Sequence, residues 1–551
     1  MKNVLEFLEK SAFSDPTAIA CGDEKEELSY SALLLASKKL GVFLSQHTAP
    51  RRPVALYLEK SVPALIGFFG IVYAGGFYSV LDPSQPMART VKILETLEPS
   101  VVLTDYANRE KAEEIIAELR KTANTVVSPE LYVLNDLPGI KDREDAQAEG
   151  ITKEEEALLS AIRDQAMDVD PLYVNFTSGS TGVPKGVTVG HRSVISFISS
   201  FVEIFGIDKE DVLGNQAPFD FDVSVKDIYS ALFAGCRLQL IPRSYFSNPM
   251  ELMDYLSEKK ITNLTWAVSA LCFVSVMNGL EYKVPEKVRR VMFSGEVMPI
   301  KHLNHWKKYL PEAMYVNLYG PTEITCNCCY YILDREFQEG EKIPLGKTFP
   351  NEKVFLLGED GNEILPGTID DKENGDHLEG EGKPEKDYFE NEGSPEGEIL
   401  VSGAGLAIGY YNDTAKTQEA FTQNPLNKAY YERCYRTGDL ARYNEKGELV
   451  YCSRKDFQIK RMGHRIELGE IESTAMKIEE VTRALALYEA DEQKLWLFYT
   501  GKADRKEVAR TLRGLLPPFM LPNKTVQIEE MPLTKNGKID RAALLARTKL
   551  L

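Results

Sequence analysis

Short apolar runs alternate with longer amphipathic segments over the first 320 residues of the chain. RPVALYL (52–58), SVVLTDY (100–106) and LYVNFTS (172–178) are typical of strands buried on both faces. Helical segments such as 109–121 and 154–164 separate them. This alternation predicts an α/β fold, with βαβ units and a mostly parallel sheet that helices cover on both faces.

The strand-like runs change character after residue 395. EGEILVSG (396–403) and GELVYCSR (447–454) are shorter and mix polar with apolar residues, which predicts an antiparallel barrel or small sheet. Further strands and helices after residue 455 look self-contained, and 551 residues exceed what one hydrophobic core supports. We therefore expect a large domain over residues 1–454 and a small one over residues 455–551.

Residues 62–81 form an apolar stretch about as long as a membrane span. Pro63 is suited to a helix start, however, and Gly75-Gly76 to a helix end, so we expect a buried helix, a tight turn and a strand. The N-terminal residues lack the apolar run of a secretory signal. We expect a protein of the cytoplasm without a membrane span.

Charge is concentrated in one segment. The net charge is -18, and residues 370–398 hold twelve Asp or Glu against three Lys. We interpret about 368–396 as an acidic loop insertion, because the segment has too few apolar residues to fold alone. The negative balance argues against nucleic acid as a partner, since nucleic-acid-binding proteins usually present a basic face.

Three of the eight cysteines, Cys326, Cys328 and Cys329, lie close together. They lack the Cys-x-x-Cys pair and the nearby histidine of a tetrahedral metal site. We expect small buried residues beside a pocket or in a core strand.

A glycine-rich decapeptide, TSGSTGVPKG (177–186), follows one of the apolar strand runs. The carboxyl ends of strands in open α/β sheets are where ligands bind, and free N–H groups, hydroxyls and a lysine suit phosphate oxygens. The residues concerned are Thr177, Ser178, Gly179, Ser180, Thr181 and Lys185. If the decapeptide is considered alone, a flexible surface loop is an equally good interpretation of it.

Four further motifs follow in order: NLYGPTEIT (317–325), YRTGDLARY (435–443), SRKDFQIKRMGHRIELGEIE (453–472) and PLTKNGKIDR (532–541). With the decapeptide they resemble the core motifs of the adenylate-forming (ANL) superfamily, over essentially the whole chain. Within it they resemble nonribosomal peptide synthetase adenylation domains and D-alanyl carrier protein ligases. The resemblance implies two sheet-and-helix subdomains plus a small barrel, followed by a small mobile α+β domain.

The resemblance implies ATP and Mg²⁺ as cofactors. Glu323 would bind the metal, and Thr322 would contact phosphate. Tyr319 would lie against the adenine, and Asp439 would accept hydrogen bonds from both ribose hydroxyls. The other nucleotide contacts that it implies are Gly295, Glu296, Asn317, Gly320 and Arg454.

The resemblance also implies one catalytic residue and one hinge. Lys538 would bridge the substrate carboxylate and the α-phosphate while a carboxylate displaces pyrophosphate from ATP. It would then withdraw as the small domain rotates about Asp456, so that a thiol can attack the acyl-adenylate.

The segment APFDFDVSVKDIY (217–229) resembles the one that opens the substrate pocket. Asp222 would hold the α-ammonium of an amino acid; Asp220, one strand period away, would share its face. The remaining residues that the resemblance implies for the pocket are Val223, Lys226, Thr265, Met292, Ser294, Leu318, Cys326 and Asn327.

Two pocket positions depart from the D-alanyl carrier protein ligases, which otherwise make D-alanine a candidate substrate. Ser294 stands where those enzymes typically have Cys, and Lys226 replaces an apolar side chain. A buried ammonium needs a counter-charge. That could be a substrate carboxylate, giving an aspartate- or glutamate-like substrate. Equally, Lys226 could turn outward or pair with Asp227 or another acid of the protein.

The expected activity is amino-acid adenylation followed by transfer to a phosphopantetheine thiol. Because no carrier segment follows Leu551, we expect the thiol on a separate carrier protein or on coenzyme A, and the enzyme as a monomer. An acyl-CoA synthetase is the alternative enzyme, and an inactive nucleotide-binding scaffold is the alternative outside the enzymes.

Overall fold

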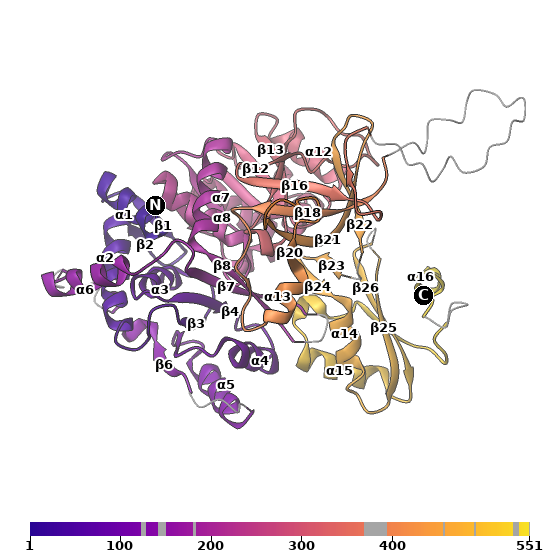
Figure 1. Cartoon of the computed structure of the whole chain (residues 1–551), viewed down its shortest axis with the longest axis horizontal. Helices are drawn as coiled ribbons and strands as arrows, with labels where there is room; N and C mark the ends of the chain where they lie inside the picture. The colour runs from indigo at the N-terminus through magenta and orange to yellow at the C-terminus, as the bar shows by residue number, and fades with distance from the viewer. Residues whose placement is uncertain are drawn as a thin grey trace, which may run out of the picture.

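The computed structural model describes eight stretches of the chain, which are residues 1–122, 128–141, 150–179, 183–367, 394–455, 458–489, 492–532 and 539–549. They form two helix-covered sheets, an antiparallel sheet and a smaller C-terminal α+β part (Figure 1). The predicted fold class is confirmed.

The first sheet contains seven strands among the described residues. Its order is β19-β8-β7-β4-β3-β5-β6, and pairing is parallel from β7 to β6. The strands are β3 (Pro53–Tyr57), β4 (Phe77–Leu81), β5 (Val101–Thr104), β6 (Glu130–Val133), β7 (Pro171–Thr177), β8 (Lys185–Gly190) and β19 (Gly409–Tyr410). The predicted strands near residues 52–58, 100–106 and 172–178 are confirmed.

The second sheet contains nine described strands in the order β15-β14-β13-β12-β11-β9-β10-β1-β2. Pairing is parallel from β13 to β1 and antiparallel at both edges. The strands are β1 (Ile19–Gly22), β2 (Glu27–Ser29), β9 (Val212–Asn215), β10 (Arg237–Leu240), β11 (Asn263–Ala267), β12 (Arg290–Ser294), β13 (Met314–Tyr319), β14 (Cys329–Ile332) and β15 (Lys347–Thr348).

The third sheet is antiparallel throughout, as the mixed polar and apolar pattern predicts. Its described strands are β16 (Glu352–Leu357), β17 (Glu363–Ile364), β18 (Gly397–Gly403), β20 (Phe421–Gln423), β21 (Arg433–Tyr443) and β22 (Leu449–Arg454). Most of the predicted acidic insertion lies outside the described residues. Glu398, which the acidic count included, is a buried residue of β18.

The C-terminal part has its own small core. Its strands are β23 (Gln458–Arg461), β24 (His464–Glu467), β25 (Val481–Glu489), β26 (Lys494–Gly501) and β27 (Lys524–Gln527). Ile466, Ile471, Leu497 and Leu512 are buried together on one face of the β25–β27 sheet. We keep the boundary near residue 455 as a proposal, because Asp456 lies outside the described residues.

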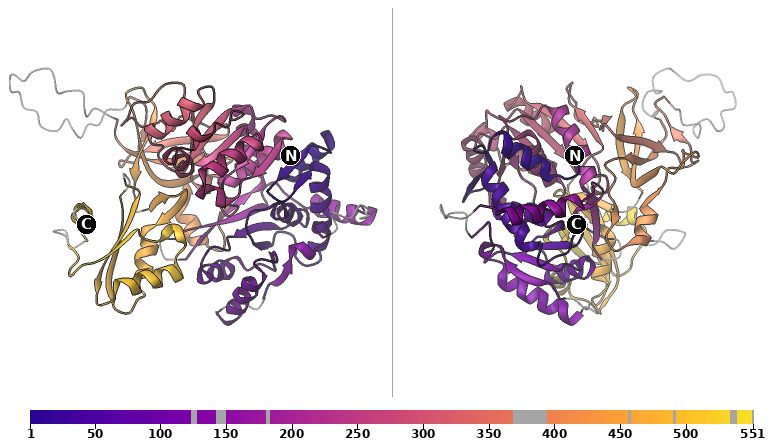
Figure 2. Two further views of the ribbon diagram at one scale, coloured as in Figure 1. Left: turned by 180° about the vertical axis from the view of Figure 1, so that it is seen from behind. Right: turned by 60° about the vertical axis from the view of Figure 1, so that its left-hand side comes forward.

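Helices flank the two large sheets (Figures 1 and 2). Those of the N-terminal part are α1 (Leu5–Ser14), α2 (Tyr30–Leu44), α3 (Val62–Tyr73), α4 (Met87–Leu97), α5 (Arg109–Thr122), α6 (Lys153–Asp164), α7 (His191–Phe205), α8 (Val223–Ala234), α9 (Pro249–Glu258), α10 (Val268–Val276), α11 (Gly279–Tyr282), α12 (Ile300–Tyr309) and α13 (Thr414–Ala420). The C-terminal ones are α14 (Leu468–Ala475), α15 (Arg505–Leu515) and α16 (Arg541–Thr548).

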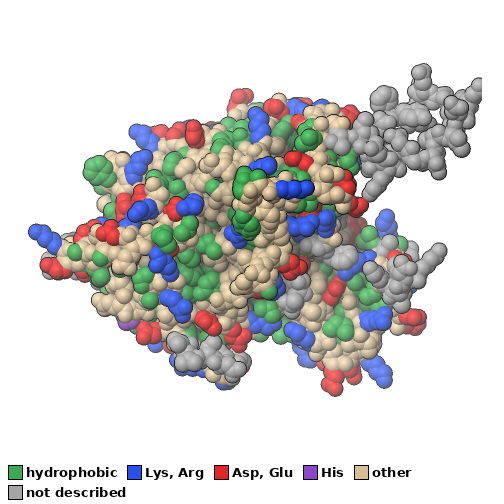
Figure 3. All heavy atoms as spheres, viewed as in Figure 1, with side chains coloured by type: hydrophobic (Ala, Val, Ile, Leu, Met, Phe, Trp, Pro, Cys, Tyr) green, Lys and Arg blue, Asp and Glu red, His purple; other side chains and the backbone are tan. Residues whose placement is uncertain are grey.

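The apolar stretch 62–81 forms α3 and β4, as predicted. The Ser61 side chain caps α3, Pro63 occupies its first turn and Gly75 takes a φ of +78° beyond its end. In the part of the chain that the structure describes, no helix is both long and apolar enough to cross a membrane. Acidic and basic side chains are interspersed over the face shown in Figure 3.

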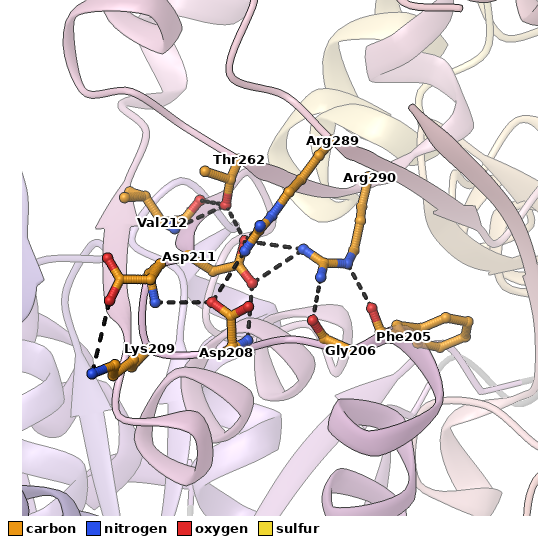
Figure 4. Close-up of polar contacts among 10 residues, drawn as sticks. Phe205, Gly206, Asp208, Lys209, Asp211, Val212, Thr262, Arg289 and Arg290 are labelled. Carbon is orange, nitrogen blue, oxygen red and sulfur yellow. Dashed lines mark hydrogen bonds and ion pairs between the residues drawn. The ribbon is translucent and has the colours of Figure 1, made fainter. Parts of the chain in front are cut away.

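A buried ion-pair cluster lies at the amino ends of β9 and β12 (Figure 4). Arg290 donates to both carboxylate oxygens of Asp211, at 3.0 and 3.1 Å, and its Nε donates to the Phe205 carbonyl at 2.6 Å. Arg289 and Thr262 also donate to Asp211, at 2.9 and 2.5 Å. Asp211 is only 1% exposed, so its buried charge is balanced by donors of the chain itself.

Candidate active site

The predicted site residues gather where the carboxyl ends of β7, β12 and β13 face the β23–β24 hairpin of the C-terminal part. This is the edge at which open α/β sheets bind ligands. The site therefore combines residues that are far apart in the sequence and belong to both parts of the chain.

Tyr319, Asp439 and Arg454 form one group. The Tyr319 hydroxyl donates to one Asp439 carboxylate oxygen, and Arg454 donates to the other, both at 2.6 Å. Burial and the nearby Asp439 carboxylate raise the pKa of Tyr319 well above its ordinary value. An aromatic ring next to a fixed carboxylate suits an adenosine, whose base can stack and whose ribose donates hydroxyls. This arrangement is compatible with the predicted nucleotide role of the group.

Glu323 is fully buried and is bound by residues that sequence reasoning did not assign. Arg465 of β24 donates to both of its oxygens, at 3.0 and 2.8 Å, and the Tyr410 hydroxyl donates at 2.7 Å. Burial alone would raise the pKa of Glu323, but Arg465 and Lys185 outweigh burial and lower it to about 2. Glu323 is therefore a carboxylate at any physiological pH.

Glu323 and its neighbours can hold Mg²⁺ only if phosphate supplies further ligands to the metal. The described residues contain no cluster of three or more metal-ligating side chains, so Glu323 would be a single protein ligand. Mg²⁺ is usually bound by one or two carboxylates plus substrate phosphates and waters. Both Glu323 oxygens accept from Arg465 here, so a metal requires that Arg465 move away.

The described part of the glycine-rich loop is bound to the same hairpin. The Ser178 hydroxyl donates to the Arg465 carbonyl at 2.7 Å and accepts from the Glu467 N–H at 3.1 Å. The Lys185 ammonium lies 3.5 Å from a Glu467 carboxylate oxygen. A Cβ on Gly179 would lie 2.0 Å from the Val183 carbonyl oxygen, so only glycine fits there. The predicted phosphate ligands Ser180 and Thr181 lie outside the described residues.

The other residues predicted to bind the nucleotide differ in the contacts that they already make. Glu296 accepts from the Gly463 N–H at 2.9 Å, while its second oxygen has no partner among the described residues. Gly295 has a φ of +95° with open space beside it. The Asn317 side chain donates to the Pro344 carbonyl at 2.8 Å. Thr322 is buried in the short η3 turn (Thr322–Ile324). Glu296 is thus the residue of this set with an unused buried oxygen.

Asp222 lies at the start of α8. The segment around it is a turn and helix start, so the strand period expected to relate Asp220 and Asp222 is wrong. Asp220 instead accepts a hydrogen bond from Gln85, at 3.0 Å. Asp222 is 5% exposed; burial raises its pKa, an effect that Lys226 and a hydrogen bond from Thr322 oppose. A carboxylate in this position can bind a substrate ammonium.

Lys226 follows one turn later on α8 and is buried. Its ammonium donates to Asn327 Oδ1 at 2.9 Å and to Ser294 Oγ at 3.3 Å. The alternative that Lys226 turns outward is therefore wrong. The other predicted pocket residues are likewise buried, namely Val223, Thr265, Met292, Leu318 and Cys326. Their contact with a substrate stays a prediction.

The turn that carries Cys326 and Asn327 is strained. Thr325 has a φ of +55° and Cys326 a φ of +73°, which are unusual for side chains other than glycine, above all for a β-branched one. The Thr325 hydroxyl donates to the Gly405 carbonyl at 2.6 Å, and Gly320 leaves room for the turn because a Cβ there would lie 2.5 Å from Asn327 Cα. Cys326 donates to the Asp222 carbonyl at 3.2 Å. Strain held in place by its surroundings is common at functional sites.

Sequence reasoning missed the residues that the hairpin places in the site. Arg465, Gly463 and Glu467 stand in the motif 453–472, which predicted a nucleotide-binding role only for Arg454. Lys460 of the same motif lies 5.9 Å from the Tyr319 ring centroid. The alternation of side chains along β23 and β24 would indicate a common face, but not which face turns toward the site.

Lys538 and Asp456 lie outside the described residues. Near Lys538 along the chain, Met531 and Ile539 pack with Trp496 and Phe498 on one face of the β25–β27 sheet. The α14 and α15 side chains pack on the other face, and α14 contacts the N-terminal part through a 2.6 Å ion pair between Glu470 and Arg89. The predicted roles of Lys538 and Asp456 stay predictions.

Comparison with known proteins places these observations in a family. Residues 8–411 match the AMP-binding enzyme family. The chain is 32% identical to bacitracin synthase 3 of Bacillus licheniformis, over 98% of this chain and 8% of that protein. It is 31% identical to a dimodular nonribosomal peptide synthase of Bacillus subtilis, over 98% of this chain and 21% of that protein. It is 29% identical to zwittermicin A synthase ZmaJ of Bacillus cereus, over 98% of this chain and 94% of that one. The chain thus spans about a fifth or less of the first two of these relatives.

Solved structures share the fold. The Vibrio cholerae adenylation domain AlmE, in complex with glycyl-adenosine-5'-phosphate, matches with a TM-score of 0.81 at 20% identity, over 100% of this chain and 98% of that one. Holo-PA1221, which contains adenylation and PCP domains, matches with a TM-score of 0.77 at 24% identity, over 99% and 84%. These likenesses concern the fold alone, whereas the family match covers most of the chain. The chain belongs to the AMP-binding enzyme family, and is an enzyme of the adenylate-forming superfamily that its ordered motifs resemble.

Proposed function

We propose that this enzyme activates an amino acid as aminoacyl-AMP and transfers it to the phosphopantetheine thiol of a separate carrier protein. The observation that carries the proposal is Asp222, a buried carboxylate at the start of α8 and within the charged site. A buried carboxylate without an ion pair among the described residues is costly unless a cation binds it, and the α-ammonium of an amino acid is such a cation.

The relatives support the same class of substrate. One of them is named a nonribosomal peptide synthase, and the AlmE structure holds a glycyl adenylate. ZmaJ is matched over nearly its whole length, so a chain of this size also occurs among the relatives. PA1221 contains a PCP domain in addition to its adenylation domain, which supports a carrier protein as the acceptor.

In the first half-reaction the substrate carboxylate attacks the α-phosphorus of ATP, and pyrophosphate leaves. Asp222 would hold the substrate ammonium, while Tyr319 and Asp439 would hold the adenosine. Lys185 and the glycine-rich loop would face the leaving phosphates, and Lys538 would bridge the two reacting groups. Mg²⁺ bound at Glu323 would neutralise phosphate charge.

The arrangement of the described residues suits the stage of the cycle after pyrophosphate has left. Arg465 occupies both oxygens of Glu323, and Ser178 is bound to the Arg465 backbone. We propose that the hairpin leaves these partners when ATP and Mg²⁺ bind and returns after pyrophosphate has left. The rotation about Asp456 would then remove Lys538 from the site and bring Arg465 into it.

Amino-acid-dependent exchange of labelled pyrophosphate into ATP tests the proposal. We expect exchange with a subset of amino acids, and its loss in Lys538→Ala while ATP binding is retained, because this lysine acts mainly on the transition state. Exchange supported only by carboxylic acids without an α-amine would favour an acyl-CoA synthetase. ATP binding without any exchange would favour an inactive scaffold.

A further inference from the structure

The ammonium of Lys226 is buried among neutral groups. Lys226 is 1% exposed, and its two hydrogen-bond acceptors are the Asn327 amide oxygen and the Ser294 hydroxyl. A lysine ammonium has three N–H donors, so the described residues leave one of them unused. Both of these acceptors are neutral, so the hydrogen bonds of the ammonium include no carboxylate among the described residues.

The two nearest acidic side chains on α8 do not balance this charge. Asp227 accepts from the Asn215 amide at 3.0 Å and its other oxygen has no partner among the described residues. Cys326, Asp222 and Asp227 oppose the effect of burial on the Lys226 pKa, but the hydrogen-bond acceptors of the ammonium are both neutral. Burial lowers this pKa nevertheless, because it disfavours the charged form.

A half-buried lysine of the same region shows what full satisfaction requires. The Lys60 ammonium donates to three acceptors, the Asn215 carbonyl at 3.1 Å, the Asn215 side chain at 3.3 Å and the Gln216 carbonyl at 2.8 Å. Lys226 has two acceptors, one of them on a strained turn, since Asn327 follows the positive-φ residue Cys326. The site holds Lys226 in place without completing its hydrogen bonds.

Lys226 and Asp222 are four residues apart at the start of α8, so their side chains lie on the same face of the helix. Cβ atoms at this spacing are about 5–6 Å apart. A chain of one or two methylene groups is therefore long enough to reach from a ligand ammonium on Asp222 to Lys226.

We propose that Lys226 binds a side-chain carboxylate of the substrate, so that the enzyme activates an acidic amino acid of aspartate or glutamate size. The inference rests on the proposed amino-acid adenylation. Among the substrates left open by the sequence, it favours an acidic amino acid over D-alanine. The carboxylate supplies the missing third acceptor and the missing counter-charge, while Asn327 and Ser294 hold the lysine toward it.

Pyrophosphate exchange with matched pairs tests this specificity. The full chain is assayed with aspartate and asparagine, glutamate and glutamine, each as D and L forms, with D- and L-alanine as neutral references. We expect kcat/KM for one acid to exceed that of its own amide by at least about 100-fold, because the amide leaves a buried charge unpaired.

Lys226→Met keeps the length of the side chain and removes its charge. We expect kcat/KM for the preferred acid to fall about 10²–10³-fold, with a much smaller change for the amide, so that the preference disappears. Lys209→Met, at a lysine whose side chain is 80% exposed, is the matched control and should keep the preference.

The outcomes separate the two proposals. Exchange that favours alanine or another neutral amino acid over every acid overturns the role of Lys226 and leaves amino-acid adenylation standing. Absence of exchange with every amino acid overturns amino-acid adenylation, and this inference with it. Should Lys226→Met fail to fold, the acid-to-amide ratio of the unaltered enzyme still decides.

Discussion

The two ends of the nine-stranded sheet treat buried charge in opposite ways. At the amino ends, Asp211 accepts from Arg290, Arg289 and Thr262, so the buried charges of Asp211 and Arg290 are paired within the same part of the chain (Figure 4). At the carboxyl ends, Lys226 binds only neutral acceptors and one oxygen of Glu296 is unpaired among the described residues.

The difference separates a structural role at the amino ends of the sheet from a ligand-binding role at its carboxyl ends. A complete network stabilises the fold and needs nothing more. An incomplete one in a strained turn is costly on its own and is completed when a ligand brings the missing partner. Substitutions should therefore reduce stability at the amino ends and activity at the carboxyl ends.

The largest expected effect is that of Asp222→Asn. The substitution keeps the shape of the side chain and removes the charge that would bind the substrate ammonium, so we expect amino-acid-dependent exchange to fall about 10⁴-fold. The free energy of unfolding in urea should fall by no more than about 1 kcal/mol, because burial already disfavours the charged form of this carboxylate. A large loss of stability with retained exchange would contradict the comparison.

Asp211→Asn is the matched change at the amino ends. It removes the counter-charge of buried Arg290, so we expect the free energy of unfolding to fall by about 3–5 kcal/mol. Exchange per folded molecule should stay within about twofold of the unaltered enzyme. Loss of exchange without loss of stability would show that the amino ends are not purely structural.

The pair between Glu323 and Arg465 joins the two parts of the chain and gives a pH-dependent test. The pKa of Glu323 is lowered from 4.5 to about 2, so the contribution of this carboxylate to stability is full above pH 4.5 and is lost as the pH falls toward 2. We expect the stability difference between the unaltered enzyme and Glu323→Gln to shrink by about 2 kcal/mol between about pH 6 and pH 3. Urea unfolding at both pH values measures it. A difference that does not change with pH would mean that Arg465 does not hold Glu323 in solution.

The smallest expected effect is that of Arg289→Ala. Its side chain is 44% exposed, so its ion pairs with Asp208 and Asp211 are screened by solvent. We expect a loss of no more than about 1 kcal/mol in the free energy of unfolding and no change in exchange. A loss as large as that of Asp211→Asn would show that both arginines are needed to satisfy the buried carboxylate.

Much of the fold could be predicted from the sequence, because it depends on local patterns. Apolar runs of strand length set β3, β5 and β7, and a proline and a glycine pair set the bounds of α3. The motifs indicated Asp439, Arg454 and Tyr319, which the structure brings into hydrogen-bonding contact.

The missed features depend on contacts between distant residues. Arg290 and Asp211 are 79 positions apart, and Arg465 and Glu323 are 142 apart in parts of the chain whose relative orientation no local pattern gives. Whether Lys226 turns inward could not be decided either, because a lysine can bury its stem or extend into water. The prediction that Asp220 and Asp222 share one face of a strand was wrong, because the residues around them form a turn and a helix start.

The most direct test of the account is a crystal structure of the enzyme with the sulfamoyl-adenosine analogue of the amino acid that supports the fastest exchange. The account predicts the α-ammonium of this analogue within hydrogen-bond distance of Asp222, and a side-chain carboxylate within hydrogen-bond distance of the Lys226 ammonium. An analogue bound with its ammonium away from Asp222, or with a neutral side chain that leaves Lys226 as it is here, would contradict it.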